Sequence, residues 1–138
     1  MAIQAYINFD GNCREAVTFY QKAFETNEPN FMTFGSMPPN EEHPITDAAK
    51  DLVMHTELVI SGDTIMFSDT WPGMPLVVGN NISLTVVDTD MDKIKAWFAT
   101  MKEGGTVEMD LQETFWSKCY GSLKDKYGII WQFSHRSE

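Results

Sequence analysis

The chain has 138 residues, of which 43% are hydrophobic, and its 20 acidic and 10 basic residues give a net charge of −10. This length predicts one domain, or two small halves that share a core, and the apolar content excludes a disordered chain. The negative charge argues against a nucleic-acid-binding surface, because phosphate backbones are bound by clustered Lys and Arg side chains.

Cysteine usage and hydropathy indicate the cellular compartment. Cys13 and Cys119 match no metal-binding spacing and no disulfide framework, and free thiols are typical of a reducing cytosol. The first residues lack the basic and then apolar pattern of a signal peptide. No stretch approaches the roughly 18 apolar residues of a membrane span. We therefore expect a cytoplasmic protein without membrane partners.

The first half of the chain predicts a strand, a helix and three further strands. Apolar and polar residues alternate over residues 3–9, which is typical of a half-buried strand. Residues 10–12 turn the chain and can cap a helix over residues 13–24, where apolar residues recur at helical spacing. The three further strands are expected at residues 31–37, 53–60 and 64–68.

The second half predicts the same order of elements after a linker at residues 71–80. A strand with alternating polarity opens at residue 81. A helix begins near Asp90, with either Asp88 or Asp90 as its cap, and it ends at Gly104-Gly105. Three further strands are expected at residues 107–109, 118–124 and 129–134. Trp131 and Phe133 belong to the predicted core beneath this helix.

The predicted fold is therefore α+β, with two βαβββ repeats (about 1–70 and 80–138) in one domain of 138 residues. Each helix must cover one face of its own four-stranded sheet. We expect the opposite faces to form a shared cleft, whose polar residues line a ligand site. These residues are Gln4, Tyr6, Asn8, His55, Glu57, Asn81, Ser83, Thr85 and Gln132.

The same pattern carries a family resemblance over nearly the whole chain. The residues that carry it are Tyr6 to Asn12, Glu15-Ala16 with Phe19-Tyr20, Met54 to Leu58, Gly62-Asp63 with Ser68-Asp69, Gly104-Gly105, Phe115-Trp116, and Asp125 with Gly128 and Trp131-Gln132. In this order and spacing they resemble the PhnB-like branch of the vicinal oxygen chelate superfamily, the group of glyoxalase I, bleomycin-resistance proteins and extradiol dioxygenases. The resemblance implies a glyoxalase/bleomycin-resistance-like fold and a homodimer.

Proteins of this branch often carry the label of a 3-demethylubiquinone methyltransferase. The present sequence has no glycine-rich strand–turn–helix motif that would hold a methyl-donor nucleotide. We therefore give this label little weight as a prediction of activity.

The resemblance also implies positions for a metal site, because metal-using members bind one divalent ion through four side chains, typically His and Glu, two from each repeat. These positions fall at Gln4 (or Ala5), Met66, Asn81 and Gln132. Amides and a thioether lack the charge and basicity that attract Zn, Ni, Fe or Mn. We therefore expect no metal at these positions and no cofactor.

Other residues leave alternatives open. His55 and Glu57 lie two apart on one strand and so point the same way, as an acid–base pair, as ligands of a relocated metal, or as a hydrogen-bonded polar pair. Asp69 either orients a ligand or bonds to the following turn. Trp116, with Phe115, either stacks on a flat ligand or caps the sheet edge.

These predictions together indicate a protein that binds a small organic molecule in its cleft. The expected ligand-binding residues are Gln4, Tyr6, Asn8, His55, Glu57, Asp69, Asn81, Ser83, Trp116 and Gln132. The first alternative is a metal-dependent lyase, isomerase or dioxygenase of the glyoxalase type that uses His55 and Glu57. The second is a resistance protein that sequesters a drug without chemistry.

Overall fold

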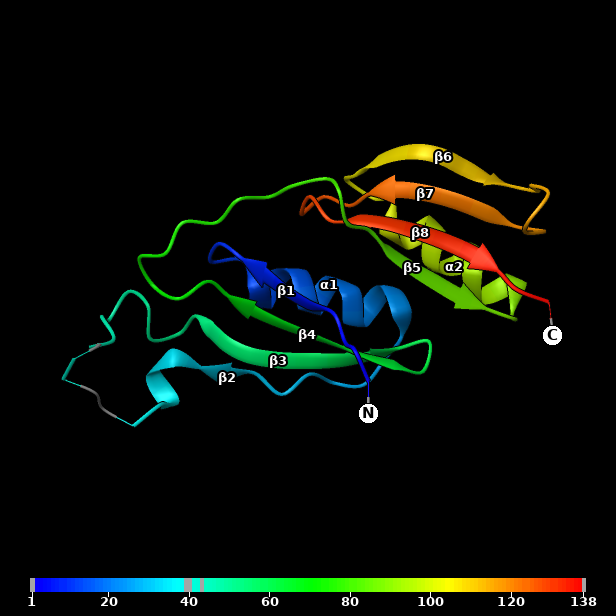
Figure 1. Ribbon diagram of the computed structural model, residues 1–138. Coiled ribbons are helices and arrows are strands. Elements are labelled where there is room, and N and C mark those ends of the chain that lie inside the picture. The colour runs from blue at the N-terminus through cyan, green and yellow to red at the C-terminus, as the bar shows by residue number, and fades with distance from the viewer. Residues whose placement is uncertain (1, 39–40, 43, 138) are drawn as a thin grey trace. The chain divides into compact units, whose positions relative to one another are not determined.

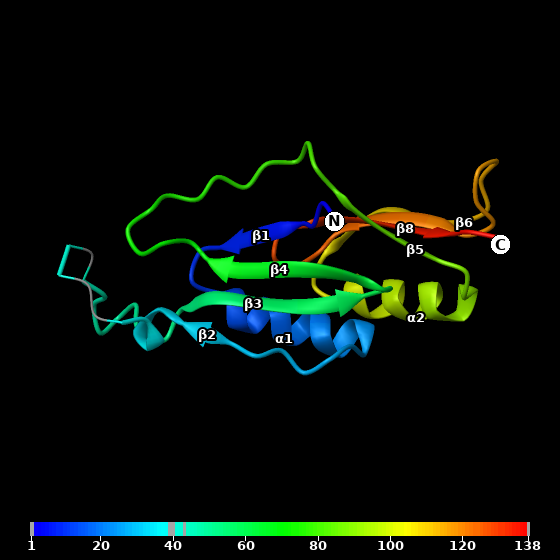
Figure 2. The ribbon, with the colours of Figure 1, turned by 60° about the horizontal axis from the view of Figure 1, so that its bottom comes forward.

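A computed structural model describes residues 2–38, 41–42 and 44–137 of the chain, which form two four-stranded sheets, each with a helix on one face (Figures 1 and 2). The elements are β1 (Tyr6–Phe9), α1 (Cys13–Phe24), β2 (Met32–Thr33), the short 3₁₀ helix η1 (Phe34–Ser36), β3 (Val53–Ile60), β4 (Asp63–Asp69), β5 (Leu84–Asp88), α2 (Met91–Met101), β6 (Thr106–Gln112), β7 (Tyr120–Lys124) and β8 (Ile130–His135). Within these ranges, no helix has both the length and the apolar character needed to cross a membrane.

The two sheets have the same topology. Their strand orders are β1-β4-β3-β2 and β5-β8-β7-β6, and in each the outer first strand runs parallel to its neighbour while the remaining pairs are antiparallel. The repeated βαβββ pattern and the α+β class are thereby confirmed. The chain divides into two compact units, residues 1–77 and 78–138, which are described separately below. The single domain and the shared cleft stay predictions.

In the first unit, α1 begins and ends where the sequence predicts, at Cys13 and Phe24, and buries one face against the sheet. Tyr20, Phe67 and Leu58 are fully buried there. The predicted cap is wrong, because the Asn12 side chain makes no cap hydrogen bond. The Asp69 carboxylate, at the end of β4, instead accepts from the backbone N–H of Cys13 at 2.9 Å.

In the second unit, α2 packs on β8 and β5. The side chain of Asp90 caps the helix by accepting from the Lys93 N–H at 3.2 Å. Trp131 and Phe133 are fully buried, and the Phe133 ring meets Phe98 of α2 edge-on with centroids 5.6 Å apart. The predicted cap and the predicted core are both confirmed.

Several predicted strand boundaries are wrong. β1 begins at Tyr6 and not at Ile3, and β5 begins at Leu84 although alternation starts at residue 81; Ile3 and Ile82 are exposed. Both are outer strands with one neighbour each, so the strand extends only as far as that neighbour pairs with it. The residues before β1 and β5 alternate in polarity, but alternation without a pairing neighbour does not extend the strand.

The outer strands at the other edges also differ from the prediction. β2 has only two residues, because a bulge follows Met32 and the chain then turns into η1. β6 extends over Thr106–Gln112, twice interrupted in register against β7, whereas alternation predicted only residues 107–109. Bulges break the two-residue period, so the sequence pattern ends before the strand does.

Residues 70–83, between β4 and β5, contain no helix or strand. This segment includes the predicted linker and carries exposed apolar side chains. The boundary between the two compact units lies within it, at residues 77 and 78.

Candidate functional site

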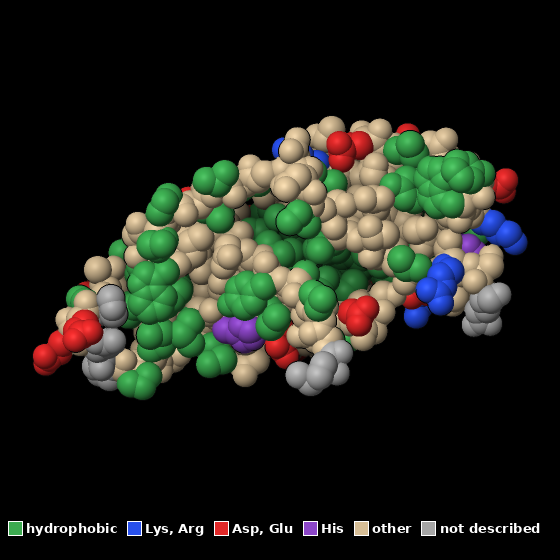
Figure 3. Space-filling model, viewed as in Figure 1, with side chains coloured by type: hydrophobic (Ala, Val, Ile, Leu, Met, Phe, Trp, Pro, Cys, Tyr) green, Lys and Arg blue, Asp and Glu red, His purple; other side chains and the backbone are tan. Residues whose placement is uncertain are grey.

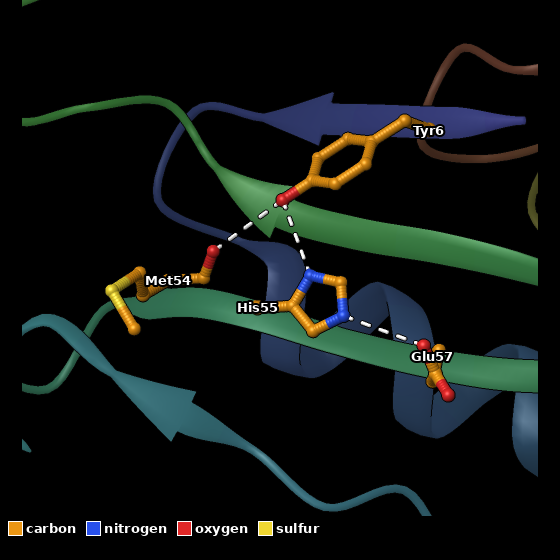
Figure 4. Close-up of polar contacts among 4 residues, drawn as sticks. All are labelled: Tyr6, Met54, His55 and Glu57. Atoms are coloured by element: carbon orange, nitrogen blue, oxygen red, sulfur yellow. Dashed lines mark hydrogen bonds and ion pairs between the residues drawn. The ribbon is translucent and has the colours of Figure 1, made fainter.

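Three of the predicted residues form a connected group on the open face of the first sheet, the face without a helix. The Tyr6 ring extends from β1 across β4 toward His55 on β3, and Glu57 follows on the same strand (Figure 4). The Tyr6 hydroxyl lies 3.4 Å from His55 Nδ1, and His55 Nε2 lies 3.4 Å from Glu57 Oε2. The prediction that His55 and Glu57 point the same way is confirmed.

The two contacts of His55 define which ring nitrogen can carry the proton. With the proton on Nε2, the imidazole donates to Glu57 while Nδ1 accepts from the Tyr6 phenol. The phenol can instead donate to the carbonyl of Met54, at 3.5 Å, which frees Nδ1 to accept from a ligand. The His55 and Glu57 side chains are 32% and 57% exposed, so a small molecule has access to both.

Sheet register places further side chains beside this group. Met66 on β4 pairs with Tyr6 on one side and Glu57 on the other. Two residues further along β1, the Asn8 side chain donates to the Ser68 hydroxyl at 2.8 Å. The open face of the first unit therefore combines hydrogen-bonding groups with the flexible thioether of Met66.

In the second unit, a hydrogen-bonded series crosses the open face of its sheet. Tyr120 on β7 donates to the Gln132 side-chain oxygen on β8, and the Gln132 amide donates to the Ser83 hydroxyl at 2.7 Å. Trp116 lies in the loop before β7 and meets the Tyr120 ring with centroids 5.3 Å apart. Three predicted residues, Ser83, Trp116 and Gln132, are thus linked through Tyr120.

The structure does not bring the other predicted residues into these groups. Gln4 and Asn81 are exposed and precede β1 and β5. Asp69 is only 3% exposed, and its two oxygens accept from the backbone N–H groups of Cys13 and Val53 at 2.9 and 2.8 Å. Of the two alternatives for Asp69, a backbone-bonding role therefore holds. Its partners, however, are the first residues of α1 and β3 and not the following turn.

The positions that the family resemblance assigns to a metal do not fit one. Gln132 uses its side-chain oxygen and its amide in hydrogen bonds to neighbours, and Met66 offers only a thioether. Among the described residues, no three His, Cys, Asp or Glu side chains gather as a metal cage would require. We derive no chemistry through an ion at these positions.

Sequence reasoning missed Tyr120 and Ser68 as members of the open faces. The signal for Tyr120 was available in the β7–β8 hairpin, because Asp125 and Gly128 fix the turn that pairs Ser122 with Gln132. Tyr120 lies two residues before Ser122 and so shares the face of Gln132.

Comparison with known proteins identifies the family. The family described as 3-demethylubiquinone-9 3-methyltransferase matches residues 1–134. The chain belongs to this family. Its curated relative Protein YjdN from Escherichia coli (strain K12) is 27% identical over 140 aligned residues, which cover 97% of this chain and 95% of YjdN.

Solved structures similar to this chain have the same fold. Protein PA1353 from Pseudomonas aeruginosa is 29% identical, with a TM-score of 0.86 over 100% of this chain and 99% of PA1353. A PhnB protein from Bacillus cereus, titled a putative 3-demethylubiquinone-9 3-methyltransferase, is 23% identical, with a TM-score of 0.72 over 99% of this chain and 100% of that protein. The chain thus has the fold that its resemblance to the PhnB-like branch of the vicinal oxygen chelate superfamily implies. The family description names an activity but does not establish it for this chain.

Proposed function

We propose that this PhnB-like protein binds a small organic ligand through the open faces of its sheets. The observation that carries the proposal is the Tyr6–His55–Glu57 group. It exposes a donor, an acceptor and a carboxylate on the face of the first sheet that lies opposite α1. Polar groups that converge next to apolar side chains are typical of ligand sites. Asn8, Ser83, Trp116 and Gln132 are further candidates for ligand contact, whereas Gln4 and Asn81 remain candidates only by their place in the sequence.

The test is a titration of the isotopically labelled protein with a panel of small phenols, alcohols, carboxylates and amides, followed by two-dimensional NMR. We expect one class to shift the backbone signals of residues 6–8 and 54–58 saturably. Tyr6→Phe should weaken this binding about five-fold, since it removes one hydrogen bond worth about 1 kcal/mol.

The matched control for Glu57→Gln is Glu28→Gln, because Glu28 is an exposed glutamate of the same unit outside the group. Glu57→Gln should alter the affinity and Glu28→Gln should leave it unchanged. A ligand that saturates the protein without shifting residues 6–8 or 54–58 would contradict the proposed site.

A second candidate is an enzyme of the glyoxalase type with a metal at His55 and Glu57. The 3.4 Å between His55 Nε2 and Glu57 Oε2 favours it, since nitrogen and carboxylate oxygen suit Zn or Ni. Two side chains are fewer than the three protein ligands usual in catalytic zinc sites. Equilibrium dialysis against Zn²⁺ and Ni²⁺, with His55→Ala as the control, separates the two candidates. One bound ion per wild-type chain that is absent from His55→Ala would support the enzyme.

A further inference from the structure

A hollow of about 710 Å³ lies at one end of the second sheet, wholly within the second unit. Its walls are the loop between β6 and β7, the ends of β5 and β8, and the residues after β8. The lining residues are Val87, Glu113 to Lys118, and Ser134 to Ser137. Figure 3 shows hydrophobic side chains gathered at this end of the sheet, with Lys or Arg side chains and a histidine beside them.

Two large aromatic side chains stand exposed at the hollow. Phe115 is 97% exposed and Trp116 is 55% exposed, which excludes the alternative that they cap the sheet edge as core. Their rings meet edge-on with centroids 4.7 Å apart, and Trp116 meets Tyr120 in the same way. Tyr120 is itself bonded to Gln132, so the indole is held in place against the sheet.

The loop that carries these aromatics is also fixed by hydrogen bonds. Ser117 is buried, and its hydroxyl lies 2.9 Å from the carbonyl of Cys119 and 2.8 Å from that of His135. The Thr114 N–H donates to the Ser117 carbonyl at 2.8 Å. A loop ordered before binding loses less conformational entropy when a ligand arrives.

The charge at the hollow has the opposite sign to that of the chain. Lys118 and Arg136 line it together with one carboxylate, Glu113, although acidic residues outnumber basic ones 20 to 10 overall. In the part of the chain that the structure describes, no carboxylate lies within ion-pair distance of Lys118 or Arg136. Both cations are exposed and available to an anion.

From the exposed aromatics, the ordered loop and the unpaired cations, we propose that this hollow binds a small flat aromatic molecule that carries an anionic group. The ring stacks against Trp116 and Phe115, and the anion pairs with Lys118 and Arg136. The inference rests on the proposed function, because Trp116 is one of its candidate ligand residues, and it adds the chemical class of the ligand.

The test uses 1-naphthoate as the probe and follows the indole N–H signal of Trp116 by NMR, assigned with Trp116→Phe. Titrations with 1-naphthylmethylammonium and with acetate measure the separate parts of the ligand. We expect 1-naphthoate to shift the Trp116 signal saturably and to bind about ten-fold more tightly than either comparison compound. Trp116→Ala should abolish the binding, which is followed in this variant by the backbone signals of residues 113–118 because the indole is absent.

The charge requirement has a matched control. The double variant Lys118→Ala/Arg136→Ala should weaken 1-naphthoate binding about ten-fold. Lys102→Ala/Lys124→Ala changes the net charge equally, at two exposed lysines of the same unit outside the hollow, and should leave the affinity unchanged. Equal losses of 1-naphthoate affinity in the two double variants would overturn the proposal. They would show that binding depends on the net charge of the chain and not on the two cations at the hollow.

Two further outcomes would overturn it. Equal affinity for the anionic and cationic naphthalenes would show a hydrophobic surface without charge selection. A dimer that Trp116→Ala converts to a monomer would show that a second copy covers the hollow. If 1-naphthoate shifts residues 54–58 and not Trp116, this inference fails while the proposed function stands. If the compound panel also gives no binding at all, both fail.

Discussion

The Asp69 carboxylate joins three elements of the first unit that are distant in sequence. It ends β4, and its oxygens accept from the first residue of α1 and the first residue of β3. This buried carboxylate satisfies one donor that would otherwise lack a partner at the N-terminus of α1 and a second donor at the start of β3. Both oxygens are thus used within the unit, where they position α1 and β3 relative to β4.

Asp69→Asn should therefore destabilise the protein by about 2 kcal/mol, because an amide nitrogen would face one of the two N–H donors. Urea denaturation measures the loss. Asp63→Asn, at the exposed start of the same strand, is the control and should change the free energy of unfolding by less than about 0.5 kcal/mol. Equal effects of the two substitutions would contradict this role.

Burial raises the pKa of the Cys13 thiol, and the Asp69 carboxylate raises it further. The folded chain thus keeps this proton above about pH 8.5, where a cysteine in the unfolded chain loses it. The contribution to stability is complete below that pH and declines as the pH rises, by at most about 1.4 kcal/mol per pH unit.

We therefore expect the stability of the wild type to fall more steeply than that of Cys13→Ala between pH 8.5 and 10. Urea denaturation of both proteins at several pH values measures how the free energy of unfolding changes with pH. Comparing the two slopes cancels the contributions of other titrating groups. Parallel pH profiles would show that Cys13 ionises as readily in the folded chain as in the unfolded one.

The residues of the site differ in how far the sequence could place them. Alternation within one strand suffices for His55 and Glu57, because residues two apart share a face whatever the neighbours are. The burial of Asp69 depends on partners from α1 and β3, and the contact of Tyr120 with Gln132 depends on the hairpin register. The contacts of Asp69 leave no local pattern, whereas the register of Tyr120 can be read from the turn at Asp125 and Gly128.

At the scale of elements, the turn between α2 and β6 has no room for a side chain at Gly105. A Cβ at Gly105 would lie 2.3 Å from the carbonyl oxygen of Lys124, at the end of β7. Backbone cannot move aside as a flexible side chain can, so the turn fixes how closely β6 approaches β7.

Gly105→Ala should cost at least about 2 kcal/mol of stability through this clash. Gly79→Ala is the control, because the nearest atom to a Cβ there is Asn81 Oδ1 at 3.5 Å. Thermal and urea denaturation of the two variants measure the difference. A Gly105→Ala protein as stable as Gly79→Ala would show that the turn adjusts.

Elements were predicted best where the signal is local. The apolar spacing of residues 13–24 and the cap at Asp90 define both helices, because helical hydrogen bonds lie within one segment. The outer strands β1, β2, β5 and β6 were misjudged in length, since a strand ends where its neighbour or a bulge ends the pairing.

At the scale of the whole molecule, the family resemblance leads us to propose a homodimer. Two copies each carry a net charge of −10, and their repulsion opposes association. Sedimentation velocity should therefore show a dimer whose dissociation constant decreases as salt rises from about 0.02 to 0.2 M, because salt screens the repulsion. A monomer at every protein concentration and salt condition would contradict the proposal.

The segment at residues 70–83 has a consequence for assembly. An extended chain advances about 3.3 Å per residue, so this segment reaches about 46 Å, whereas a unit of this size has a radius of gyration of only about 11 Å. Its length therefore permits the second unit of one copy to meet the first unit of another. A flexible tether gives two units of one chain an effective concentration in the millimolar range. The connecting segment is therefore long enough for two copies to exchange units. The protein concentration during refolding decides how often they do so.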